Sequence, residues 1–147
     1  MGVSLYCKKT KKSIDMPCSG FNRLRDRISY LYGEPWASHH HELMKPEHIF
    51  FFDKNEEKAF FERFDKKTAE MIAKKKVPVK LVDFCLQSDG EGRIHYGACK
   101  LLLKIIGDYD GENEVYGYGG WNDAPRMQHF KELLQECVEN KCDLVWW

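Results

Sequence analysis

The chain opens with two short runs in which apolar residues alternate with more polar ones. Val3, Leu5 and Cys7 form the first run, and Ile14 and Met16 form the second, after the polar segment KKTKK. A period of two residues is typical of a strand that has one buried face. We therefore predict a β-hairpin over residues 3–17.

Later segments carry apolar residues at helical spacing. The helices predicted from this spacing run from Ser19 to Tyr32, from Asn55 to Lys76, over residues 79–87, from His95 to Ile106 and from about Asp123 to Asn140. Ser19 is the expected N-cap of the first, and Gly33 and Gly107 are placed to end two of them. Pro78 suits the first turn of the third. The alternation of Val77, Val79 and Leu81 keeps a strand open there as an alternative.

Two segments between these helices have weaker patterns. Residues 37–44, ASHHHELM, indicate a short element that Ser38 would cap. Residues 108–121 contain too many glycines for a helix and are expected to form a long loop.

The C-terminal residues CDLVWW read as a further strand. Because two strands alone make a marginal sheet, we expect this strand to join the N-terminal hairpin. The predicted fold class is α+β, mainly α-helical, with a small antiparallel sheet and helices packed on one side. Residues 1–147 are expected to form a single globular domain.

Composition narrows the class of protein. Apolar residues make up 43% of the 147 residues, the formal net charge is zero and the pI is about 7.0. The chain has no apolar run long enough to span a membrane and no apolar signal core near its start. These features predict a cytoplasmic protein without membrane association, and hence six reduced cysteines rather than three disulfides.

The loop LQSDGEGRIHYGA resembles a calcium loop. With Gly92 at the sixth position, Asp89, Glu91 and Ile94 stand where such a loop needs them, but Gln87 and Ala98 replace the first and last carboxylates. We therefore expect a structural turn, in which Asp89 caps and Gly92 bends the chain.

A resemblance can be stated for this loop and for the opening segment. LQSDGEGRIHYGACKLL, with Cys99 in its helix, and SLYCKKTKKSIDMPCSGFNRLRDRI resemble segments of small uncharacterised bacterial proteins. The resemblance covers about a third of the chain. It implies a bacterial cytosolic protein, of a kind associated with phages or mobile elements, whose activity is unknown. It assigns no catalytic residue.

Histidines and cysteines are the candidate metal ligands. Of the cluster formed by residues 39–41 and His48, only His41 and His48 could share one helix face, and Asp89 and Glu91 are the other weak metal candidates. No Cys-x-x-Cys pair occurs, although Cys137 and Cys142 are five residues apart across a helix end. We expect these thiols and imidazoles to be scattered through the fold.

Charge and aromatic residues suggest where a partner would bind. Residues 1–33 contain seven basic and two acidic residues, a net charge of +5, whereas residues 81–147 have a net charge of −6. The candidate partner-binding residues are Lys9, Lys11, Lys12, Arg23 and Arg27 on the basic face, and Tyr116, Tyr118 and Trp121 in the glycine-rich loop. The basic residues have an alternative role, which is to pair with the acidic half of the chain.

These observations favour a non-enzymatic protein that binds a macromolecular partner, without a cofactor. Two alternatives stay open: a small metal-dependent or Cys/His hydrolase, and a nucleic-acid-binding protein. A homodimer is compatible with the opposite charges of the two halves.

Overall fold

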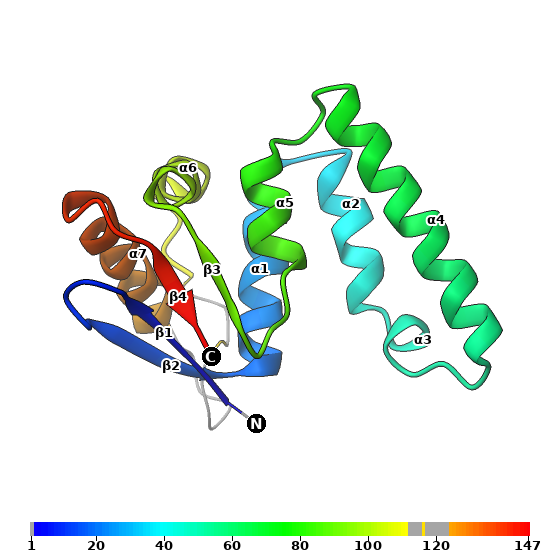
Figure 1. The fold of residues 1–147 in the computed structure, drawn as a ribbon, viewed down its shortest axis with the longest axis horizontal. Coiled ribbons are helices and arrows are strands. Elements are labelled where there is room, and N and C mark those ends of the chain that lie inside the picture. The colour runs from blue at the N-terminus through cyan, green and yellow to red at the C-terminus, as the bar shows by residue number, and fades with distance from the viewer. Residues whose placement is uncertain (1, 112–115, 117–123) are drawn as a thin grey trace.

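The computed structural model describes residues 2–111, 116 and 124–147. Its sheet has the strand order β2-β1-β4-β3 and is antiparallel at every pairing (Figure 1). The strands are β1 (Gly2–Cys7), β2 (Ser13–Pro17), β3 (Gly92–Ile94) and β4 (Leu144–Trp146). The predicted hairpin and the predicted C-terminal strand are confirmed, and so is the α+β class.

Register explains which face of the sheet is buried. Leu5 of β1 lies opposite Ile14 of β2 and opposite Trp146 of β4. All three side chains are buried, whereas their neighbours along the strands are more exposed. One face of the sheet therefore packs on the core, as the period of two residues requires.

Helices supply most of the remaining structure. They are α1 (Cys18–Tyr32), α2 (Trp36–His41), the 3₁₀ helix η1 (Glu42–Met44), α3 (Pro46–Ile49), α4 (Lys54–Ala73), α5 (Val79–Leu86), α6 (Tyr96–Ile106) and α7 (Ala124–Glu139). In Figure 1, α6 and α7 lie beside the sheet, α1 and α5 stand next to them, and α2, α3 and α4 form an arm on the far side of α1 and α5.

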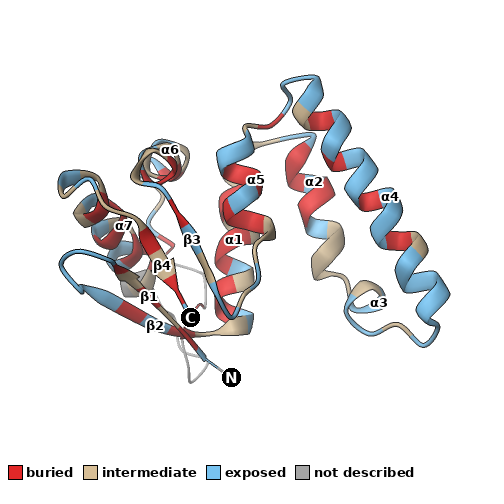
Figure 2. Cartoon of the chain, in the orientation of Figure 1, coloured by how far each residue is buried: buried red, intermediate tan, exposed pale blue. Residues whose placement is uncertain are grey.

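The hydrophobic core extends from the sheet into this arm. Phe21, Phe84 and Trp146 pack edge to face beneath the strands, with ring centroids 5.4–6.0 Å apart. Trp36 of α2 and Met71 of α4 belong to the same cluster of buried residues. Figure 2 shows that buried residues of α4 face inward along one side, while the other side of this helix is exposed.

Several local predictions at the helix ends were wrong. Helix α1 begins at Cys18 after Pro17, so Ser19 does not cap it. Ser38 lies inside α2 and donates its hydroxyl to the carboxylate of Glu34, which is four residues earlier. The predicted caps failed because each helix starts before the serine.

The structure also decides the secondary structure of two further segments, residues 79–86 and residues 92–94. Residues 79–86 are helical, so the strand alternative there is excluded. Gly92–Ile94 form a strand that the sequence did not predict, and β4 supplies its partner. A side chain at Gly92 would come within 2.3 Å of the Trp146 ring, which is why this position needs glycine.

Candidate functional site

A cleft of about 770 Å³ separates the arm from α1 and the end of α5. Its volume lies within the range of small-molecule and peptide pockets, about 300–1,000 Å³. Residues of α1, α2, η1, α3 and α4 line it, together with the segment that follows α5. Neighbours in this cleft are therefore distant in sequence, because the cleft exists only where the arm meets α1.

Arg25 holds the polar wall of the cleft in place. Its side chain is 3% exposed and donates to the backbone oxygens of Gln87 at 2.9 Å, Ser88 at 3.2 Å and Cys85 at 3.4 Å. The guanidinium also lies 4.0 Å from the ring centroid of Phe21. Burial lowers the pKa of Arg25 to about 10, so it stays charged at neutral pH. Arg25 thus fixes the chain that leaves α5 against α1.

The opposite wall is apolar and continues onto the surface. Leu43, Met44, Ile49, Phe61 and Phe64 line this side of the cleft. Of these, Ile49 and Phe61 are also exposed to solvent.

Three phenylalanines follow Ile49 along the chain, and the first and third of them are exposed. Phe50 is 77% exposed and Phe52 is fully exposed. Together with Ile49 and Phe61 they form what we call the aromatic rim. The run of three phenylalanines at residues 50–52 is the feature of the sequence that indicates this surface.

The histidine cluster converges only in part, because two of its members share one carboxylate and the others point elsewhere. His39 stacks on Phe64, with centroids 4.0 Å apart, and hydrogen-bonds to Thr68 at 2.8 Å. The Nδ1 atoms of His40 and His41 each lie 2.8 Å from the carboxylate of Asp26.

His48 lies apart from these three. It hydrogen-bonds to the backbone oxygen of Glu42 and stacks on Phe60. His41 and His48, the two histidines expected to share a helix face, therefore have different partners.

His39 gives the fold a dependence on pH. Burial, followed by the positive charges of Lys67 and His40, lowers the pKa of His39 from 6.5 to about 4. Because the unfolded chain binds this proton more readily, the contribution of neutral His39 is complete above pH 6.5 and is lost as the pH falls to about 4. We expect a loss of about 3 kcal/mol in the free energy of unfolding over this range.

Urea denaturation between pH 7 and pH 4 would measure this effect. The variant His39→Gln should show a correspondingly shallower dependence on pH. Asp26 also contributes to the pH profile, because its hydrogen bonds to His40 and His41 outweigh burial and lower its pKa. The contribution of Asp26 is the same in the wild type and in His39→Gln, so it cancels when the two pH profiles of stability are compared. Equal slopes would contradict the role of His39.

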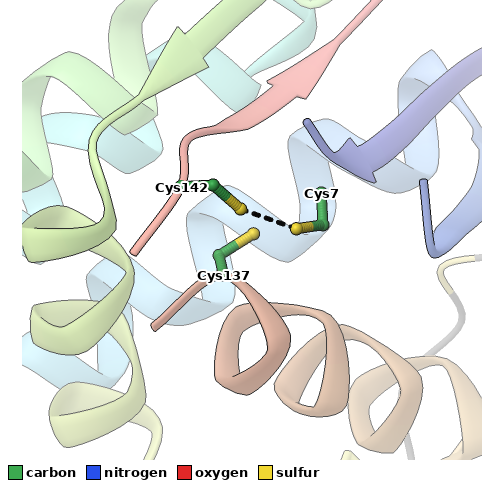
Figure 3. Close-up of side chains that lie close together, drawn as sticks. All are labelled: Cys7, Cys137 and Cys142. Atoms are coloured by element: carbon green, nitrogen blue, oxygen red, sulfur yellow. Dashed lines mark hydrogen bonds between the residues drawn. The ribbon is translucent and has the colours of Figure 1, made fainter. Parts of the chain in front are cut away.

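Three of the six cysteines meet at a second place, next to the sheet, and a fourth, Cys99, lies beside them. The Sγ atoms of Cys7, Cys137 and Cys142 all lie within 4.8 Å of one another, and those of Cys7 and Cys142 are 2.7 Å apart (Figure 3). Cys99 lies next to Cys137, outside this group of three sulfurs. The expectation that the thiols are scattered is therefore wrong. Only the Cys137–Cys142 spacing signalled this cluster in the sequence.

The cysteine cluster is asymmetric in its protonation. Burial raises the pKa of Cys7, but hydrogen bonds with Cys142 and with the side chain and backbone of Thr10 outweigh it and lower the pKa to about 7. The hydrogen bond with Cys99, together with burial, raises the pKa of Cys137. Of Cys7 and Cys137, Cys7 is therefore the thiol that loses its proton at the lower pH.

The calcium-like loop is held by bonds to the rest of the protein. Gln87 bonds to both backbone groups of Arg93, and the carboxylate of Asp89 accepts from the side chain of Asn22. Asp89 therefore does not cap the turn as expected, and Glu91 is exposed. Within the described part of the chain, the cysteine cluster is the only group of three or more metal-ligating residues close enough to share an ion.

The basic candidate residues lie in two places. Lys9, Lys11 and Lys12 are exposed in the turn that precedes β2, whereas Arg23 and Arg27 belong to α1, which follows β2. The length of β2 thus separates the two groups. Lys12 lies 4.0 Å from Glu132 of the acidic half, as the alternative role of these residues predicted.

The aromatic loop is described only in part. Tyr116 is completely buried in the core, so its ring is not available to a partner in this conformation. The backbone of Tyr116 lies against Gly20 of α1, where an added Cβ would come within 1.8 Å of the Tyr116 carbonyl oxygen. Tyr118 and Trp121 lie outside the described residues.

No family model, curated protein or solved structure matches this chain. None of the helices in the described regions has the length and apolar character needed to cross a bilayer.

Proposed function

We propose that the protein is a non-enzymatic binding protein that captures an apolar segment of a partner protein in the cleft between α1 and the arm. The observation that carries this proposal is the continuity of the apolar cleft wall with the aromatic rim. Exposed apolar surface of this kind, next to a concave pocket, is typical of protein-binding sites.

The rim argues for a protein segment rather than a small molecule. A ligand confined to the cleft would leave Phe50 and Phe52 in water, because they follow Ile49 outside it. A peptide with two or more large apolar side chains can fill the cleft and also cover the rim. Apolar anchors of this type carry most of the binding free energy in peptide–groove complexes.

The charges along the cleft argue against nucleic acid as the occupant. Arg23 and Arg25 line the cleft, but Asp65 and Asp89 line it as well. A phosphate backbone is bound by an excess of positive charge, which this surface lacks. A mixed surface of this kind suits an amphipathic peptide, whose polar side chains can pair with either sign.

A library of displayed peptides, selected against the full chain, would test this function. We expect the enriched peptides to share large apolar residues and to shift the NMR signals of residues in the cleft. Phe61→Ala should weaken a selected peptide at least tenfold, about 1.4 kcal/mol. The control Trp147→Ala removes an exposed aromatic side chain outside the cleft and should leave the affinity unchanged.

Three results would contradict the proposal, and the first concerns the basic hairpin turn. Reversal of Lys9, Lys11 and Lys12 to Glu should leave binding intact, and loss of binding in that variant would assign the site to the hairpin instead. A wild-type dimer that Phe61→Ala dissociates would identify the occupant as a second copy of the chain. Failure to enrich any peptide that Phe61→Ala weakens would reject the cleft as a protein-binding site.

A further inference from the structure

The cysteine cluster lies outside the cleft and is not used by the proposed function. Its members come from four separate elements: Cys7 ends β1, Cys99 belongs to α6, Cys137 belongs to α7, and Cys142 lies between α7 and β4. Cys7, Cys99 and Cys137 are completely buried, and Cys142 is partly buried. Three thiols that meet from distant parts of the chain, with a fourth beside them, need a reason to be together.

The directions of the side chains provide a first indication. In Figure 3 the sulfurs of Cys7, Cys137 and Cys142 point toward one another from β1, α7 and the segment before β4. Cys99 reaches the same place through its contact with Cys137. Tetrahedral coordination of Zn²⁺ by cysteine uses four sulfurs at about 2.3 Å from the ion, which places them about 3.8 Å apart.

The backbone of the hairpin turn, next to two of the sulfurs, provides a second indication. The backbone of Lys9 bonds to the sulfurs of both Cys7 and Cys142, and the backbone of Thr10 bonds to Cys7. Amides that point at a sulfur stabilise the thiolate form, which is the form that binds metal. The hairpin turn therefore acts as an outer shell that orients two of the four sulfurs.

We propose that Cys7, Cys99, Cys137 and Cys142 form a structural zinc site that joins the hairpin to α6, α7 and β4. On binding, four thiols release four protons to solvent, and four thiolates coordinate one Zn²⁺. Soft thiolate ligands in a closed tetrahedral set select zinc over magnesium or calcium. Burial of three ligands leaves no open coordination position for a substrate, so the role is structural.

The surrounding charges agree with this assignment. A zinc ion with four thiolates carries a net charge of −2. The residues next to the ligands include Lys8 and Lys9 after Cys7, and Lys141 before Cys142. This gives the basic hairpin turn a role within the molecule, which is to offset the charge of the site.

Coordination of one ion by all four sulfurs requires two adjustments. Cys99 lies outside the group of sulfurs within 4.8 Å of one another and must move closer to that group. Cys7 and Cys142 must move apart by about 1 Å to reach the spacing of zinc ligands. Cys142 lies in the short segment between α7 and β4, where the backbone can adjust without breaking a helix or strand. A disulfide between Cys7 and Cys142 is the competing arrangement, but it would use only two of the four sulfurs.

Elemental analysis of the full chain, purified without an affinity tag from zinc-supplemented cells and then dialysed, tests the site. We expect one zinc ion per chain. Cys142→Ser should reduce the zinc content to background, because it removes a ligand that is only partly buried. Cys18→Ser is the matched control, since Cys18 is equally partly buried but lies outside the cluster, and it should retain the ion.

A second measurement begins with the wild type, so its main result does not depend on whether a variant folds. Titration of the reduced, metal-free wild type with Co²⁺ should give the visible bands of a tetrahedral ion and a sulfur-to-cobalt charge-transfer band. Cys99→Ala should lower the charge-transfer intensity by about a quarter, because one of four thiolates is lost. Zinc should raise the melting temperature of the wild type, and a chelator should reverse the rise.

Each alternative result would overturn the proposal. Absence of a tetrahedral cobalt spectrum in the wild type would reject the metal site. Full zinc content in Cys142→Ser, or unchanged charge-transfer intensity in Cys99→Ala, would reject the ligand set. Iron in place of zinc would reject the ion, and a Cys7–Cys142 disulfide found by mass spectrometry in protein without metal would assign the cluster to disulfide formation.

Discussion

Replacement of Trp146 by alanine is expected to lower the free energy of unfolding by about 3–5 kcal/mol, whereas the same change at the adjacent Trp147 should cost less than about 1 kcal/mol. The two residues have the same side chain and are neighbours in sequence. They differ in burial, because Trp146 is 1% exposed and Trp147 is 71% exposed.

The contacts of Trp146 explain the size of its effect. Its ring packs against Phe21 and Phe84, and its indole N–H donates to the backbone oxygen of Ser88 at 2.9 Å. Removal of the ring leaves a cavity where β4 meets α1 and α5. Trp147, in contrast, bonds to Ser4 through its backbone, and this bond survives loss of the side chain.

Urea denaturation of the two variants at equal protein concentration would measure both effects. Equal m-values for wild type and variant would show that the same surface is exposed on unfolding. Similar losses of stability in Trp146→Ala and Trp147→Ala would contradict the position of Trp146 in the core.

The second large effect is expected at Arg25. Replacement by methionine keeps much of the side-chain volume but removes the donors that serve the backbone oxygens after α5. The oxygens of Cys85 and Gln87 then lose the Arg25 donor, and we expect a loss of about 3–5 kcal/mol in the free energy of unfolding. Ser88 is less affected, because Trp146 also donates to its oxygen.

Arg23→Met is the matched control for this prediction. Arg23 belongs to the same helix and also lines the cleft, but its side chain is exposed. Its replacement should cost less than about 1 kcal/mol. Equal losses for the two variants would show that the carbonyl contacts of Arg25 contribute nothing to stability.

Arg25 and Trp146 should also be coupled, since both donate to Ser88. The double variant Arg25→Met/Trp146→Ala is therefore expected to lose more stability than the two single variants added together, because only the double variant leaves the Ser88 oxygen without either donor. This segment after α5 connects the core to the polar wall of the cleft. Its stability and the shape of the binding surface are thus expected to change together.

Secondary structure was predictable where the apolar pattern is strong and local. The hairpin, the five longer helices and the C-terminal strand all follow from spacing within each segment. The strand at residues 92–94 could not be predicted from the sequence, because three residues are too few to show a period. Its hydrogen-bonding partner, β4, lies about 50 residues further along the chain. The helix caps were misjudged because Pro17, rather than Ser19, precedes the first helical residue.

The candidate sites were less predictable than the fold. The phenylalanines at residues 50–52 indicate an aromatic surface in the sequence. The cleft beside this surface exists only because the arm packs against α1. The histidines at residues 39–41 were considered as metal ligands because they are consecutive. In the structure His40 and His41 share the carboxylate of Asp26, whereas His39 bonds to Thr68 and stacks on Phe64.

The sequence by itself determined the longer helices, the hairpin, the C-terminal strand and the α+β class, because these depend on side chains a few residues apart. Tertiary structure alone decided which side chains meet. Cys7 and Cys142 are 135 residues apart, and no local period records that β1 and β4 would bring them together. Contacts between distant residues arise from the packing of whole elements, so both the cleft and the thiol cluster could be recognised only in the folded chain.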